Sequence, residues 1–451
     1  MTTRDAVAAP AIEIALKTIL GKEYFQHVEA SGEGNDSEID EFMLETRQSA
    51  FHWIVNQDPM QLEFDAPNLV QRFLLVLFYY QTTRHQQWKE CNPPATPQGS
   101  ASIKFCYKPD IVTGEATSTI WGDQWLSASH ECQWAGVTCE TVLSKEKTLV
   151  RLQMLRNQLN GPLPWEITQL PHLKRLVLHG NMLSGMLPPK LLSFSLELLH
   201  LGNNQLSGPI PAGWFEILHD GATIPSEVGV PPLKSFRLDN NSLTGSLPLD
   251  LFHLAETTKN LNIGLILQPF LLLKLTGTLP SEIGLLTHLQ LILLSHTSIA
   301  GTIPSEIGLA TQLTEFRAAY SNMEGTLPKE LYAKLTDLVA FVVNDCNFSG
   351  TISPLLGRLT GLQWLSLSNN NFDGTIPNEI ESLTDMRRLE VNGNQFTGTV
   401  PVSVCENLDV TFEVVVVADC LPNPRTGVPT VECGDDCCTS CCHNTGVCLA
   451  N

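Results

Sequence analysis

Six cysteines close to the end of the chain have the clearest chemical potential. Four of them form the pattern Cys-Cys-x-x-Cys-Cys directly before His443. Four thiolates at this spacing can hold zinc, whereas adjacent cysteines also suit a dense disulfide module. We favour the disulfide module, and stoichiometric zinc retained without reductant would contradict it. The six residues are Cys433, Cys437, Cys438, Cys441, Cys442 and Cys448.

No motif in the sequence indicates catalysis. The chain lacks a phosphate-binding loop followed by Lys, a Gly-x-Ser-x-Gly elbow, a His-Glu-x-x-His pair and the signature set of protein kinases. Acidic residues outnumber basic ones 47 to 27, which gives a net charge of −20. No basic stripe is apparent that could neutralise phosphates. We therefore expect no enzyme activity, no cofactor, no bound metal and no nucleic-acid partner.

A tetrapeptide of the type Gly-Thr-Ile-Pro recurs ten times between Gly161 and Gly398. The steps between successive glycines are 24, 23, 37, 32, 24, 24, 25, 24 and 24 residues. A fixed period in the twenties predicts a solenoid of stacked units. Each unit reads Leu-x-x-Leu-x-Leu-x-x-Asn-x-Leu-x-Gly-x-Ile-Pro, and its alternating leucines predict a short half-buried strand.

The Asn of each unit should bond the backbone of the turn after the strand, so that stacked units form a ladder. Four middle units depart from this rule with Leu273, Thr297, Ser321 and Cys346, and only Leu273 should leave a gap. The long steps predict irregular repeats at residues 212–224 and 255–275, with extra residues around 255–262. The ladder asparagines are Asn157, Asn181, Asn204, Asn241, Asn370 and Asn394.

This pattern resembles the plant-type leucine-rich repeat over residues 149–420. The resemblance implies a right-handed α/β solenoid with a parallel sheet on its concave face. Upstream, Cys132-Gln-Trp-Ala-Gly-Val-Thr-Cys139 resembles the N-terminal cap of that family, which implies a Cys132–Cys139 disulfide. The complete layout resembles receptor-like leucine-rich repeat proteins of diatoms.

Both ends of a solenoid need covering. We predict a helical cap over residues 37–148, with helices at 38–55 and 69–80, after an acidic disordered lead-in at 1–36. Cys91 and Cys106 in this cap are candidates for a second bridge. Cys405 and Cys420 bracket the last strand, and residues 421–451 form a Cys-rich tail.

Twelve of the thirteen cysteines lie outside the ladder, and this even number is compatible with six disulfides. Such a density indicates an oxidising compartment. The first residues nevertheless contain no apolar signal segment, and no membrane-spanning stretch follows. We expect an extracellular or cell-surface protein whose signal or membrane anchor is missing from this chain, with a cytosolic protein as the alternative.

Specificity should come from the residues between the strand leucines, which point outward. We predict ligand contacts where bulky or charged side chains occur. Alanine at Tyr320 and Trp364 should weaken ligand capture and leave thermal unfolding nearly unchanged. The leading function is recognition of a peptide, protein or glycan, and the alternatives are an inhibitor of a cell-wall hydrolase or a structural wall protein. The predicted contact residues are Arg237, Arg317, Tyr320, Asp345 and Trp364.

Overall fold

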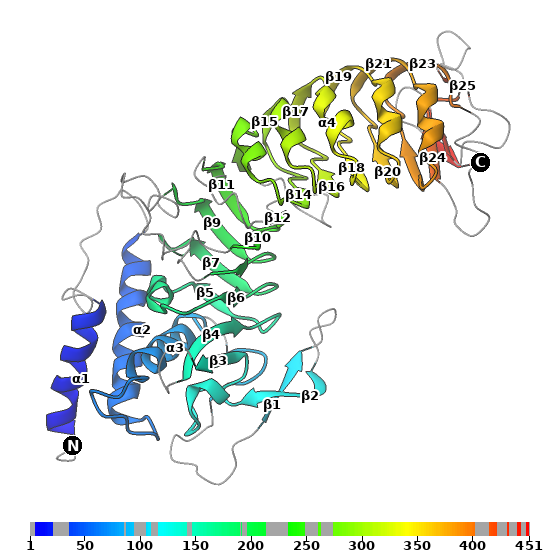
Figure 1. Cartoon of the computed structure of the whole chain (residues 1–451). Coiled ribbons are helices and arrows are strands. Elements are labelled where there is room, and N and C mark those ends of the chain that lie inside the picture. Colours follow the sequence, from blue (N-terminus) through cyan, green and yellow to red (C-terminus); the bar gives the residue numbers. More distant parts are fainter. Residues whose placement is uncertain are drawn as a thin grey trace. The chain divides into compact units, whose positions relative to one another are not determined.

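The computed structural model contains two compact units, Met1–Trp214 and Phe215–Asn451, each of which is described by itself. The structure describes residues 5–20, 36–84, 87–93, 105–109, 116–141, 147–189, 191, 196–212, 233–248, 260–262, 274–401, 415–421, 431–432, 440–442 and 448–450. Figure 1 labels the helices and strands of both units.

The first unit begins with three helices: α1 (Asp5–Leu20), α2 (Asp36–Asn56) and α3 (Leu69–Gln81). Helix α3 is buried along nearly its whole length, since most of its residues are apolar and its buried polar side chains, such as Arg72, are paired. Both predicted helices are confirmed. The predicted disordered lead-in is wrong for Asp5–Leu20, because Ile12 and Leu16 give this segment an apolar face, and both side chains are buried.

The helical cap is held together by tryptophans and one buried charge network. The ring of Trp134 packs against those of Trp53 and Trp125, with centroids 6.5 Å and 5.3 Å apart, respectively. Arg72 is fully buried, and its Nη2 lies 2.7 Å from Asp58 Oδ1. Its guanidinium also lies 4.6 Å above the ring of Trp134. A buried charge survives only when it is paired in this way.

Stacked strands follow in the first unit. A hairpin of β1 (Phe105–Pro109) and β2 (Ala116–Asp123) and a short 3-10 helix, η1 (Glu131–Gln133), precede them. We call the sheet of β3 (Val137–Thr141), β4 (Lys147–Gln153), β6 (Arg175–Val177) and β8 (Leu198–His200) the N-terminal sheet. A second sheet contains β5 (Asn160–Pro162), β7 (Met182–Met186) and β9 (Gln205–Pro209).

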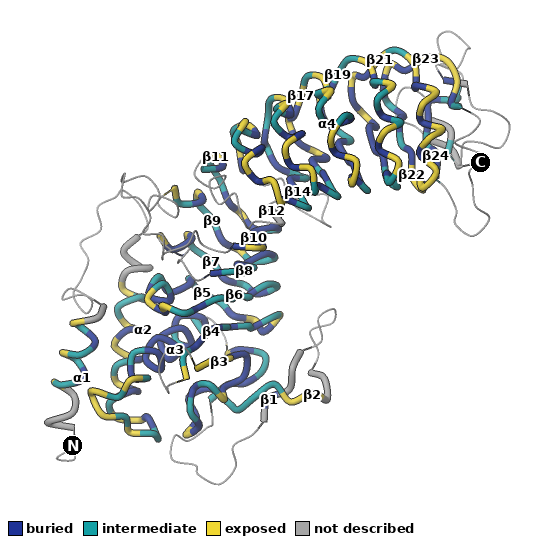
Figure 2. Tube along the Cα trace, viewed as in Figure 1, coloured by how far each residue is buried: buried dark blue, intermediate teal, exposed yellow. Residues whose placement is uncertain are grey.

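The second unit repeats this plan in a sheet that we call the long sheet. Its middle consists of parallel three-residue strands whose central residue is buried (Figure 2). The strands are β10 (Ser235–Arg237), β12 (Asn260–Asn262), β14 (Leu291–Leu293), β16 (Glu315–Arg317), β18 (Ala340–Val342), β20 (Trp364–Ser366), β22 (Arg388–Glu390), β24 (Val415–Ala418), β26 (Ser440–Cys442) and β27 (Cys448–Ala450).

Shorter strands and single helical turns complete each repeat of the solenoid. The opposite side carries β11 (Ser242–Ser246), β13 (Lys274–Thr276), β15 (Ala300–Gly301), β17 (Asn322–Gly325), β19 (Asn347–Thr351), β21 (Asn371–Thr375), β23 (Gln395–Thr399) and β25 (Val431–Glu432). The helical turns are η2 (Trp165–Gln169), η6 (Ser281–Leu285), η7 (Ser305–Leu309), α4 (Lys329–Lys334), η8 (Pro354–Arg358) and η9 (Asn378–Ser382).

The asparagine ladder is present in both units. Asn370 illustrates it: its Oδ1 accepts from Phe348 N, and its Nδ2 donates to Val343 O and Leu367 O. Asn394 repeats the same bonds one unit later, with Phe372 N as its donor. Each asparagine amide therefore connects its own turn to the preceding repeat.

The polar residues that replace asparagine in the ladder make fewer hydrogen bonds between repeats. Thr297 and Ser321 each donate to a carbonyl of their own turn, and Cys346 reaches the neighbouring turn at Ala318 O. The predicted gap at Leu273 lies outside the described residues. The ladder ends with Asp419, which the sequence reading missed and whose Oδ2 accepts from Gly393 N and Asn394 N.

The irregular middle of the chain needs one correction. The sequence reading placed the extra residues around 255–262, but Asn260–Asn262 form strand β12, in register with β10 and β14. The extra length therefore follows this strand, within residues 263–273. The other predicted irregularity, at 212–224, lies almost wholly outside the described residues.

The cysteines divide into three groups. Cys132 and Cys139 form a disulfide, with Cα atoms 5.5 Å apart. Cys91 and Cys106 are free buried thiols here, so the structure lacks the bridge that we predicted between them, although their side chains are hydrogen-bonded. Cys420 is disulfide-bonded to a partner outside the described residues.

The predicted Cys-rich tail is described only in part. Cys405, Cys433, Cys437 and Cys438 lie outside the described residues, and the backbones of Cys442 and Cys448 are paired in an antiparallel ladder. The choice between a disulfide module and zinc therefore stays a prediction. None of the helices in the described ranges has the length and apolar character needed to cross a bilayer.

Candidate ligand-binding surface

The long sheet presents two rows of outward side chains across β16, β18, β20 and β22. Register places Glu315, Ala340, Trp364 and Arg388 in one row. Val342 follows Arg317 in the second row, which continues through Ser366 to Glu390. The repeat alone creates these rows, because each unit contributes the residues on either side of its buried central side chain.

Trp364 is the centre of this surface. The guanidinium of Arg317 lies 4.6 Å from its ring centroid, and that of Arg388 lies 5.0 Å from it. The two arginines come from strands on opposite sides of β20. Each stays close to a glutamate of its own strand, Arg317 Nε at 2.8 Å from Glu315 Oε2 and Arg388 Nε at 2.8 Å from Glu390 Oε1. We call these five residues the tryptophan cluster.

The expectation that Trp364 is freely exposed is wrong. Its ring is half-buried between the two guanidinium groups, and its Nε1 is buried without a hydrogen-bond partner in the described part of the chain. The outward residues of β18, Ala340 and Val342, are also buried although they belong to the outer rows. Removing the indole should therefore lower stability as well as binding, contrary to the sequence-based expectation.

A second group runs along the edge of the same surface, one residue before the ladder position in successive units. His296, Tyr320, Asp345 and Asn369 all have positive φ there, between 53° and 58°. Asparagine, aspartate and histidine tolerate this left-handed backbone, whereas tyrosine is unusual in it. The same position also has a positive φ at Arg156, Asn203 and Asn240, so the repeat itself imposes the conformation. We call these four residues the aromatic edge.

Tyr320 and His296 stack with ring centroids 4.5 Å apart and an interplanar angle of 8°. Tyr320 is 44% exposed, as the sequence predicted. Burial raises its pKa, and the charge and hydrogen bond of Asp345 raise it further. Burial lowers the pKa of His296, and the Asp345 charge opposes this shift. At neutral pH the edge therefore presents a neutral phenol and a neutral imidazole beside a carboxylate.

Asp345 joins the aromatic edge to its neighbours. Asn344 Nδ2 donates to its Oδ2 at 2.7 Å, and Asn369 Nδ2 donates to its Oδ1 at 2.9 Å. Of the five predicted contact residues, Arg317 and Trp364 belong to the tryptophan cluster, and Tyr320 and Asp345 to the aromatic edge. Arg237 belongs to neither group: three strands away from Arg317 in the long sheet, it is paired with Asp239, Nε to Oδ1, at 3.1 Å.

Five residues of these two groups were not among the predicted contacts: His296, Glu315, Asn369, Arg388 and Glu390. The signal for His296 was its position directly before the ladder slot, the same position as Tyr320 and Asp345. For Arg388 the signal was the register of the repeats, which aligns it with Trp364.

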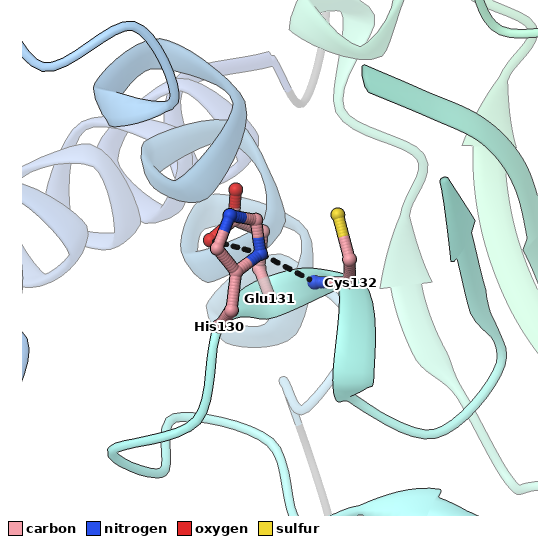
Figure 3. Close-up of side chains that lie close together, drawn as sticks. All are labelled: His130, Glu131 and Cys132. Carbon is pink, nitrogen blue, oxygen red and sulfur yellow. Dashed lines mark hydrogen bonds and ion pairs between the residues drawn. The ribbon is translucent and has the colours of Figure 1, made fainter. Parts of the chain in front are cut away.

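One group of side chains in the described residues is close enough to suggest a metal site. His130, Glu131 and Cys132 lie together in the cap (Figure 3). Cys132 is not available as a thiolate, because its sulfur is bonded to Cys139. Glu131 is engaged by Arg72, Asn68 and Gln71. The group therefore has a structural explanation, in which it fixes η1 against α3.

Comparison with known proteins agrees with this architecture. The family model described as Leucine Rich Repeat matches residues 195–216, 232–254 and 361–383. The LRR receptor-like serine/threonine-protein kinase FEI 2 of Arabidopsis thaliana is 31% identical over 111 residues, which are 25% of this chain and 16% of the kinase. The chain thus spans less than a fifth of that relative's length.

Solved structures give the same result. The LRR ectodomain of the Arabidopsis thaliana receptor kinase GASSHO1/SCHENGEN3, in complex with CASPARIAN STRIP INTEGRITY FACTOR 2, is 28% identical with a TM-score of 0.55. That match covers 64% of this chain and 32% of the ectodomain. The ectodomain of the Arabidopsis receptor kinase HAESA, with an extended IDA peptide hormone, is 25% identical with a TM-score of 0.51 and covers 62% and 43% respectively. The chain is thus a leucine-rich repeat solenoid with homology to plant leucine-rich repeat receptor-like kinases.

Proposed function

We propose that this chain is a non-catalytic recognition protein, a receptor-like ectodomain at the cell surface or outside the cell. Its ligand is a peptide or an extended segment of a protein, bound across the tryptophan cluster and the aromatic edge of the long sheet. The observation that carries the proposal is the Trp364 ring held between Arg317 and Arg388, because aromatic and Arg side chains dominate binding energy at interfaces.

The charge arrangement supports a peptide as the ligand. Each arginine of the tryptophan cluster has a glutamate at hydrogen-bond distance, so the surface offers both signs of charge within two rows. A polypeptide supplies carboxylates, amides and cations at short intervals and can match such a mixed surface. The two ectodomain structures to which this chain is similar were determined with peptide or protein ligands, which agrees with this reading.

The aromatic edge adds selectivity. Tyr320 and Asp345 form a donor and acceptor pair, and the stacked imidazole of His296 limits the rotation of the phenol. A rigid aromatic side chain contributes contact area at low entropic cost. Because backbone strain orients these side chains before binding, little further ordering is needed when a ligand arrives.

Selection from a random peptide library displayed on phage tests the proposal. The purified chain is the bait, and enriched peptides are then measured by calorimetry against Arg317→Ser/Arg388→Ser and against Arg237→Ser. We expect the double variant to lose about tenfold or more in affinity, since two hot-spot contacts are lost, and the single variant to bind normally. Peptides that bind both variants as tightly as the native protein would contradict the proposed surface.

A further inference from the structure

The N-terminal sheet carries a basic surface of its own, separate from the surface proposed above. Arg151 of β4 and Arg175 of β6 are in register on neighbouring strands, and Val177 and His200 are in register on β6 and β8. Lys174 precedes Arg175, and His179 follows the strand in the same unit. The sequence alone showed no basic stripe, because these residues are dispersed over fifty positions and only the stacking gathers them.

Arg151 and Arg175 are not neutralised by an ion pair. Neither guanidinium makes a hydrogen bond or ion pair in the part of the chain that the structure describes. Parallel neighbours lie about 5 Å apart at Cα, so two like charges in register repel each other. This acidic protein has many carboxylates that could pair with the two arginines and relieve their repulsion. Because the two arginines nevertheless stay without an ion pair in the described residues, the arrangement points to an external anion.

The carboxylate of Glu140 lies close to both arginines, but its ion pair is with another residue. It is paired with Lys174, at 2.8 Å between Oε2 and Nζ. Lys174 lowers the pKa of Glu140 most strongly, and the charges of Arg175 and Arg151 lower it further. Glu140 therefore lies in the positive field of the two arginines while its ion pair is with Lys174.

Arg156 extends the basic surface to the edge of the sheet. It precedes the ladder residue Asn157, and its side chain crosses Gly180 of the next unit, where a Cβ would lie 2.8 Å from Arg156 Cγ. Gly180 also has φ +76°, so both space and backbone favour glycine there.

We infer that this surface binds a linear polysaccharide that carries sulfate or uronate groups, through Arg151, Arg156, Lys174, Arg175, His179 and His200. Guanidinium groups bind such oxyanions in bidentate fashion, and clusters of basic residues are typical of heparin-binding patches. A peptide would require pockets for its side chains or aromatic anchors. The outward residues between the cations are Gln153, Val177 and Leu198, which offer neither.

The test uses the full chain on immobilised heparin and, in solution, heparin and polygalacturonate as probes for sulfate and uronate. The variant Arg151→Ser/Arg175→Ser should elute at lower salt and bind its preferred probe about tenfold more weakly. Its plot of log affinity against log salt should lose about two units of slope, one for each lost cation. Arg151→Lys/Arg175→Lys keeps the charges and should retain most of the slope.

The matched control is Arg317→Ser/Arg388→Ser, which removes two outward arginines from the long sheet. It should bind both probes like the native protein. A wrong assignment of the polysaccharide surface can therefore be distinguished from a wrong assignment of the peptide site. Unchanged retention of Arg151→Ser/Arg175→Ser, or equal losses in the control, would overturn the inference. A poly-glutamate peptide or a DNA duplex that binds as tightly as the polysaccharides would overturn the choice of ligand.

Discussion

The outward faces of the N-terminal sheet and the long sheet are built by the same repeat, and they differ in how their arginines are satisfied. In the long sheet, Arg317 and Arg388 each contact a glutamate two residues away and share the ring of Trp364. In the N-terminal sheet, Arg151 and Arg175 lie side by side without such partners. The same repeat can therefore present a surface of mixed charge in one unit and a cationic surface in the other.

The two units also differ in what stabilises them. The first depends on a cap with a buried arginine, and Gln71 of α3 accepts a hydrogen bond from Leu149 N at 2.6 Å, which attaches the cap to the first parallel strand. The ladder of asparagine side chains runs in both units, so the cap is what the first unit adds to it. We therefore expect a mutation in one compact unit to change the stability or binding of that unit and to leave the other unit unchanged.

The largest effect is expected from Arg72→Met. It leaves Asp58 and Glu131 buried without their cation, which should cost about 3–5 kcal/mol. Hydrogen exchange should increase in β4 and β6 and stay unchanged in β16 to β22. Lys174→Met breaks an exposed pair and should leave the free energy of unfolding nearly unchanged. Faster exchange spread evenly over both units would show that they unfold together, and the contrast between them would fail.

Asn370→Ala should rank second. It removes the acceptor of Phe348 N and the donor to two carbonyls in a buried turn, at about 1–3 kcal/mol. Thr297→Val is the control, because Thr297 donates a single hydrogen bond within its own turn. Urea denaturation monitored in the second unit measures both. Equal losses of unfolding free energy in the two variants would mean that the hydrogen bonds between successive repeats add no stability to the ladder.

Trp364→Ala should come third, at about 1–2 kcal/mol, because the half-buried ring contacts two cations and covers neighbouring side chains. Selected peptides should also bind it at least tenfold more weakly. Tyr320→Ala should weaken peptide binding and change stability by less than about 0.5 kcal/mol, since the ring is exposed. Thermal unfolding of both variants is the measurement. An unchanged melting temperature for Trp364→Ala would contradict the half-buried position of the indole and indicate that it is freely exposed.

The smallest effect concerns Asp419 at the end of the ladder. Burial raises its pKa, opposed by the bonds from Gly393 N and Asn394 N. A raised pKa means that the folded state holds the proton more tightly, so the stabilisation from protonation is present below the unfolded pKa of about 3.9 and is lost as pH rises through the folded pKa. Asp419→Asn should therefore be more stable than the native protein at pH 7, and the difference should shrink toward pH 4. Melting curves over this range would contradict the idea if the difference grew at low pH.

Most of the scaffold could be read from the chain because its repeats are local. The alternation around Leu365 and Leu367, the Asn370 turn and the following glycine all lie within one unit, and short-range periodicity determines such elements. Helices at 38–55 and 69–80 were predictable for the same reason. Helix α1 was not, because two buried aliphatic residues decide it and only packing shows that they are buried.

The candidate surfaces were less predictable. Arg317, Trp364 and Arg388 are far apart in sequence, and their contact depends on the stacking of four units in register. Sequence reasoning found Trp364 but took it to be exposed, since nothing local places two guanidinium groups over its ring. The unpaired state of Arg151 and Arg175 is likewise a property of their neighbours on adjacent strands.

The sequence by itself determined that this protein is a solenoid of leucine-rich repeats with an asparagine ladder, because both depend on residue types at short, fixed spacings. The disulfide-bonded cap was implied by the resemblance of its Cys132–Cys139 segment to the cap of plant-type leucine-rich repeat proteins. Only the tertiary structure decided which outward residues meet. Stacking places side chains about 24 positions apart on adjacent strands, and it thereby determines which charges are paired, which ring is covered and which cations face solvent together.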